Sequence, residues 1–86
     1  MTRLWSRGDP IQVVVDAGGL PVRFEWQGHW HEVATVANRW RVRAGWWQPG
    51  SDAWREYVKL TTVDGLLCTL YCDLNNGAWC CARVYD

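Results

Sequence analysis

The chain has 86 residues, of which 49% are hydrophobic and 21% charged, and its nine basic and nine acidic residues give a formal net charge of zero. This composition excludes a disordered protein, and a chain this short builds one domain with a thin core. Zero net charge argues against binding duplex DNA by bulk electrostatics, so any contact with nucleic acid must be local. We expect a single domain over residues 1–86, in which residues 1–9 form a flexible N-terminal segment.

The hydrophobic pattern of the first half has a period of two, which predicts β-strands. Residues 11–15 and 20–26 alternate in this way on either side of the turn sequence DAGG, so we expect them to form a hairpin. The pair Gln27-Gly28 then turns the chain into a long strand over residues 30–44.

This third strand carries the sequence NRWRVRA before the loop GWWQPGSDA. Its alternation slips between Val33 and Val36, which predicts a β-bulge near Ala34. Beyond the bulge, alternation predicts that Trp40 and Val42 anchor the core, whereas Arg39, Arg41 and Arg43 face outward or pair with acids on the neighbouring strands.

The second half contains two strong hairpin signals, Asp64-Gly65 and Asn76-Gly77. They separate predicted strands over residues 54–63, 66–73 and 78–85. The fold class we expect is all-β: a small antiparallel meander of five or six strands curled into an SH3-like barrel. The chain shows no export signal and no apolar run long enough for a membrane span, so we expect a cytoplasmic protein.

The same alternation rule assigns the faces of the later strands. The side chains expected inside are Val58, Leu60, Leu66, Cys68, Leu70, Cys80, Ala82 and Val84, and those expected outside are Arg55, Tyr57, Lys59, Tyr71, Trp79, Arg83 and Tyr85. The outer set mixes cations with aromatic rings. That mixture is typical of surfaces that bind single-stranded nucleic acid, and equally of ordinary cross-strand packing.

The four cysteines and two histidines lack the paired spacing of a zinc site, so we expect no metal and no cofactor. Without an export signal the cysteines are expected to be reduced thiols. Cys72 could lie opposite Cys80 or Cys81 across the last hairpin, and the sequence leaves both open. No nucleophile, base and acid fall into a recognisable arrangement, so we expect no catalytic residues and no enzyme.

The motifs PVRFEWQGHWHEV, NRWR, GWW, WREYVKLTT and DGLLCTLYCDLNNGAWCCARVYD occur in this order over nearly the whole chain. The pattern resembles a family of small, uncharacterised, Trp-rich bacterial proteins. Members of that family are usually encoded beside, or fused to, Y-family and related error-prone DNA polymerases of the SOS mutagenesis cassette. The resemblance implies a role in DNA damage tolerance and brings no assigned activity with it. The chain departs from the family pattern at Asn38, where an acid is usual, and at Cys72, where an Arg is usual.

The adjacent indoles of Trp46 and Trp47 lie in a predicted loop, where both cannot enter a small core. An exposed indole beside Arg is typical of an interaction hot spot. Our leading hypothesis is therefore a non-enzymatic interaction module that binds a protein, such as an error-prone DNA polymerase. The residues expected to bind this partner are Trp46, Trp47, Arg41 and Arg43. The alternative is a small barrel that binds single-stranded nucleic acid through Arg39, Arg41, Arg43, Arg55, Tyr57 and Lys59.

Overall fold

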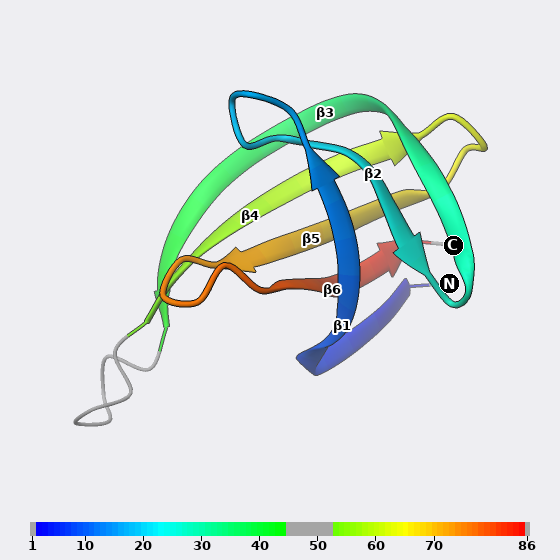
Figure 1. Ribbon diagram of the computed structural model, residues 1–86. Coiled ribbons are helices and arrows are strands. Elements are labelled where there is room, and N and C mark those ends of the chain that lie inside the picture. Colours follow the sequence, from blue (N-terminus) through cyan, green and yellow to red (C-terminus); the bar gives the residue numbers. More distant parts are fainter. Residues whose placement is uncertain (1, 45–52, 86) are drawn as a thin grey trace.

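The computed structural model describes the backbone of residues 2–44 and 53–85, and the side chains of residues 10–43 and 54–85. The described residues form six strands and no helix: β1 (Thr2–Val15), β2 (Pro21–Trp26), β3 (His29–Ala44), β4 (Ala53–Thr62), β5 (Leu67–Asp73) and β6 (Trp79–Tyr85). Each strand pairs with the next in antiparallel orientation, and β1 also pairs with β6, so the sheet closes into a barrel (Figure 1). The predicted all-β antiparallel meander, curled into a small barrel, is confirmed.

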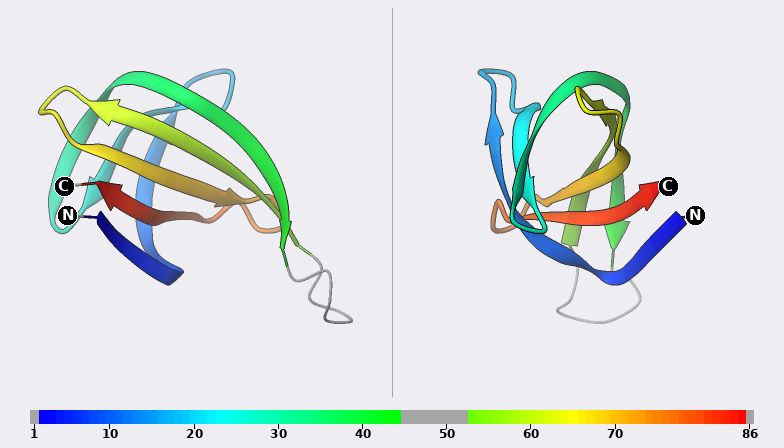
Figure 2. Two further views of the ribbon diagram at one scale, coloured as in Figure 1. Left: turned by 180° about the vertical axis from the view of Figure 1, so that it is seen from behind. Right: turned by 90° about the vertical axis from the view of Figure 1, so that its right-hand side faces the viewer.

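β1 closes the barrel because it pairs with two different strands. Its residues 12–15 pair with β2, whereas residues 2–4 and 9–11 pair with β6. Figure 2 shows β1 curving around one side of the barrel between these two partners. The strand begins at Thr2, where β6 supplies backbone partners for residues 2–4.

The turns between the strands follow the sequence signals. Gln27 and Gly28 both have positive φ values, 52° and 79°, as a two-residue hairpin between β2 and β3 requires. Gly65 has a φ of 91°, and its N–H donates to the carbonyl of Thr62 at 3.0 Å. A side chain at Gly65 would strain that backbone conformation, which explains why glycine follows Asp64 here.

β3 contains two bulges rather than one. Its register with β4 shifts after Val33 and again after Val36, and the extra residues are Ala34 and Ala37. The first is the predicted bulge. The second carries no signal in the sequence, and it inverts the face on which every following side chain of β3 lies.

The faces predicted for the end of β3 are therefore wrong. Arg39 pairs in register with Val58, which is fully buried, whereas Trp40 pairs with Tyr57 on the opposite face. We call the face that carries Val58 the inner face, and the other the outer face. Trp40 and Val42 lie on the outer face and are exposed, while Arg39, Arg41 and Arg43 lie on the inner face.

A further bulge lies in β6, and because of it two side chains of this strand lie on faces other than those predicted. The register with β5 shifts between Thr69 and Leu70 and skips Ala82. As a result Cys81, and not Cys80, is fully buried, and Trp79 packs against the core instead of facing outward. Arg83, Val84 and Tyr85 keep their expected faces, whereas Ala82, expected inside, is the bulged residue without a partner on β5. The core consists of Phe24, Val58, Leu60, Cys68, Leu70, Cys81 and Val84.

Candidate functional site

The end of β3 (residues 39–44) pairs with the start of β4 (residues 53–58), and we call this pair the ribbon (Figure 1). Its last two register pairs, Arg43 with Trp54 and Ala44 with Ala53, lie beyond the last register pair of β4 with β5. β2 pairs with β3 only over residues 29–32, so no described strand flanks β3 on that side along the ribbon. β5 accompanies β4 as far as Arg55, which pairs in register with Asp73. The side chains of residues 39–43 are therefore exposed on both faces of the ribbon.

On the inner face, a buried carboxylate holds two arginines. Glu56 is only 6% exposed, and its two oxygens accept hydrogen bonds from the Nε atoms of Arg39 and Arg41, the latter at 3.1 Å. Burial alone would raise the pKa of Glu56, but the hydrogen bonds and charges of Arg39 and Arg41 outweigh it and hold the pKa below its usual value. Glu56 is thus ionised at neutral pH and fixes both guanidinium groups.

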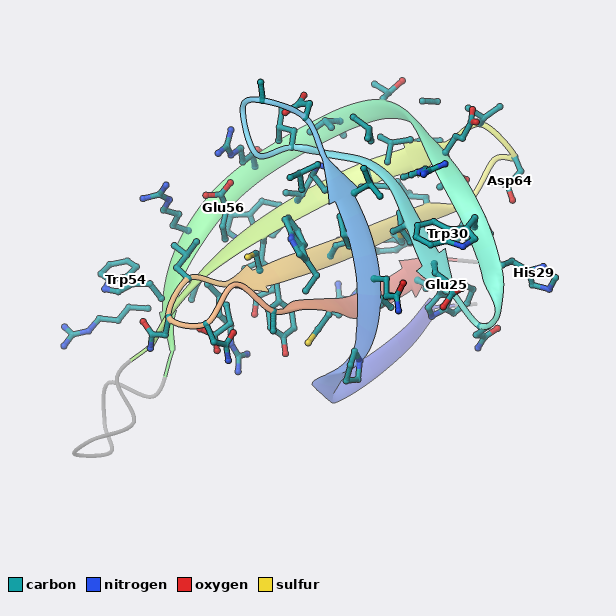
Figure 3. The ribbon with its side chains drawn as sticks, viewed as in Figure 1. Glu25, His29, Trp30, Trp54, Glu56 and Asp64 are labelled. Atoms are coloured by element: carbon teal, nitrogen blue, oxygen red, sulfur yellow. The ribbon has the colours of Figure 1, made fainter. Side chains whose placement is uncertain are left out.

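Further along the same face lies an exposed indole. Trp54 is 50% exposed and pairs in register with Arg43. Figure 3 shows Trp54 at the end of the ribbon, away from the barrel. Arg41, whose side chain is 64% exposed, lies between Arg43 and the barrel. We call Arg41, Arg43 and Trp54 the inner ribbon patch.

On the outer face, three aromatic rings form a row across β3, β4 and β5. The ring centroids of Trp40 and Tyr57 lie 5.5 Å apart with an interplanar angle of 7°, and those of Tyr57 and Tyr71 lie 5.3 Å apart. The guanidinium carbon of Arg55 lies 4.6 Å from the centroid of Tyr71. Burial beneath these neighbours raises the pKa of Tyr71 to about 12, with a contribution from its hydrogen bond to Cys80. We call Trp40, Tyr57 and Tyr71 the aromatic row.

A second cluster of cations and an aromatic ring adjoins this row. The Nζ of Lys59 lies 5.1 Å and the guanidinium carbon of Arg83 lies 5.7 Å from the ring centroid of Tyr85. A hydrogen bond with Thr69 is the largest influence on the pKa of Tyr85, and with the help of Arg83 it lowers that pKa despite partial burial. The two clusters together place Arg55, Lys59 and Arg83 on one continuous surface.

The six residues expected to bind nucleic acid fall on two different faces. Arg39, Arg41 and Arg43 lie on the inner face, whereas Arg55, Tyr57 and Lys59 lie together on the outer face. The alternation of β4, β5 and β6 already pointed to Tyr71, Arg83 and Tyr85 as outer residues. Trp40 was missed, because only the second bulge of β3 brings it to this surface. Trp46 and Trp47 lie outside the described residues.

The histidines and cysteines form no comparable site. His31 stacks on Phe24 with centroids 5.5 Å apart, and its Nδ1 lies 3.0 Å from a carboxylate oxygen of Asp64. Burial raises the pKa of Cys68 to about 12 and also raises that of Cys72, which keeps both as thiols at neutral pH. Across residues 2–44 and 53–85, no three His, Cys, Asp or Glu residues come together as candidate metal ligands.

A closed six-stranded antiparallel barrel places the protein among the small all-β barrel domains. Within that class, the chain belongs to the family described as a domain of unknown function, DUF6504, whose model matches residues 3–86. No curated protein and no solved structure matches the chain. In the part of the chain that the structure describes, no helix could cross a membrane.

Proposed function

We propose that this protein is a non-enzymatic interaction module that binds a protein partner through the inner ribbon patch. The observation that carries the proposal is the position of Trp54: its indole is half exposed, in register with Arg43, near the end of the ribbon. Trp and Arg are the residues most enriched at interface hot spots. An indole at this position can enter a pocket of a partner without disturbing the barrel core.

The charge arrangement supports a specific docking surface. Glu56 accepts a hydrogen bond from Arg41 before any partner arrives, so part of the side-chain entropy of Arg41 is already lost before binding. A guanidinium group in a fixed position pairs with a carboxylate in a defined geometry. The matching partner surface carries carboxylates next to an apolar pocket.

The partner class that we propose is an error-prone DNA polymerase of the Y family or a related one, which would make the protein an accessory of translesion synthesis. The support for this class is the motif resemblance, which implies genes beside, or fused to, such polymerases. Family membership over residues 3–86 is consistent with that resemblance, although the family description carries no function.

The test is the affinity of the full-length protein for a Y-family polymerase of the same organism, measured by isothermal titration calorimetry. Trp54→Ala should weaken binding by about 2 kcal/mol or more, as expected for a hot-spot indole. The matched control is Trp30→Ala, because Trp30 is 49% exposed and lies at the opposite end of β3 (Figure 3). The proposal fails if the wild-type protein does not bind the polymerase, or if both variants bind with equal affinity.

A further inference from the structure

The outer face of the ribbon carries an aromatic stack with one open end. Trp40 lies parallel to Tyr57, at 7°, so one face of its indole is covered. No described strand lies beyond β3 at this position, and Trp40 remains 37% exposed. The other face of the indole can therefore receive one more planar ring, which would continue the row of Tyr71, Tyr57 and Trp40.

The charges around this stack favour an anionic ligand. Arg55 lies over Tyr71, and Lys59 and Arg83 lie over Tyr85, so three cations accompany the rings. Among the described residues of β4, β5 and β6, Asp73, the register partner of Arg55, is the only acidic side chain on the outer face. The described outer face is thus locally basic, although the whole chain has a net charge of zero.

We infer that this outer face binds single-stranded nucleic acid, with a base stacked on the open face of Trp40 and phosphates beside Arg55, Lys59 and Arg83. A single strand fits because its bases are exposed for stacking, while a duplex hides them. A neutral protein with a few grouped cations also favours local contacts over the bulk attraction that binds duplex DNA. The inference does not rest on the proposed function: the inner ribbon patch lies on the opposite face of the same two strands.

The test is fluorescence anisotropy of a labelled oligothymidylate of about 16 nucleotides, the upper site size of comparable barrels. The full-length protein should bind it, and Trp40→Ala should weaken binding roughly fivefold or more, because stacking of one base is lost. Trp40→Phe keeps a planar ring and should retain most of the affinity. Trp30→Ala is the matched control, because Trp30 is an exposed indole beside a cation, Arg23, at another place on the barrel.

A second pair of variants tests the phosphate contacts. Lys59→Gln with Arg83→Gln should lower the salt slope by about 1.4, at about 0.7 for each lost phosphate contact. Arg23→Gln, which removes an equivalent cation over Trp30, should leave the slope unchanged. Thermal unfolding of every variant shows whether the barrel is intact.

The inference is overturned if the wild-type protein does not bind the oligonucleotide. Equal affinity for a duplex of the same length would also overturn it, as would equal losses for Trp40→Ala and Trp30→Ala.

Discussion

Arg39 donates a hydrogen bond from its Nε to the buried carboxylate of Glu56, although strict alternation along the strand assigns Arg39 to the outer face. The pairing is possible because the bulge at Ala37 turns Arg39 to the inner face, where β4 presents Glu56. One extra residue therefore decides which side chains of the ribbon are anchored and which are displayed.

Removing the carboxylate should destabilise the protein. In Glu56→Gln, Arg39 and Arg41 keep at most one acceptor and lose the opposite charge, which should lower the free energy of unfolding by about 1 kcal/mol. The value lies at the low end of charged hydrogen bonds because both guanidinium groups are substantially exposed. Urea denaturation measures it. Glu32→Gln, at an exposed position on the neighbouring strand β3, serves as the control and should cost far less.

The ionisation of Glu56 should also make the free energy of unfolding depend on pH. The folded-state pKa of Glu56 lies below the unfolded value of about 4.5, so its contribution is complete above pH 4.5 and is lost as the pH falls through the folded pKa. In that window the unfolded chain binds the extra proton, so stability rises with pH. Comparison of wild type with Glu56→Gln by denaturation from neutral pH to pH 3 isolates this residue from Asp64, whose pKa is also lowered. Parallel curves for the two proteins would contradict the assignment.

The bulge in β6 gives a prediction about the vicinal cysteines. Cys81 is fully buried, so Cys81→Ser places a hydroxyl in the core and should cost roughly 1–3 kcal/mol of stability. Cys80 lies on the outer face beside Tyr71, and Cys80→Ser should cost much less. Chemical denaturation of both variants provides the measurement. The reverse order of stability would mean that Cys80 faces the core, as unbroken alternation predicts.

Two tyrosines of the outer face should titrate far apart. The hydrogen bond with Thr69 and the nearby cations lower the pKa of Tyr85, whereas burial raises that of Tyr71 to about 12. In an ultraviolet pH titration, Tyr85→Phe should remove the earliest phenolate signal, and Tyr71→Phe should remove the latest one. If Tyr85→Phe instead removed the latest signal, the arrangement of Thr69, Arg83 and Tyr85 described above would be incorrect.

The fold was largely predictable because its signals are local. Pairs such as Gln27-Gly28 and Asp64-Gly65 set the hairpins, and alternation between them marks the strands. The slip between Val33 and Val36 revealed the first bulge. The bulges at Ala37 and Ala82 could not be found in this way, because an alanine fits either face and no neighbouring residue marks the change of register.

The candidate site could be predicted only where alternation along the strand is unbroken. Arg55, Tyr57 and Lys59 follow unbroken alternation on β4, and the structure brings them together on the outer face. Trp40 and the three arginines of β3 follow the unmarked bulge, so their faces were exchanged. The role of Trp46 and Trp47 stays a prediction, since both lie outside the described residues.

The central claim is that the ribbon presents two separate binding surfaces, one on each face. A crossed titration tests it most directly: Trp54→Ala and Trp40→Ala are each titrated with the polymerase by calorimetry and with the single-stranded oligonucleotide by anisotropy. We predict that Trp54→Ala weakens only polymerase binding, by about 2 kcal/mol or more. Trp40→Ala should weaken only oligonucleotide binding, roughly fivefold or more. The two-surface account would be contradicted if both variants lost affinity for the same ligand. It would also be contradicted if neither variant lost affinity for the polymerase or for the oligonucleotide.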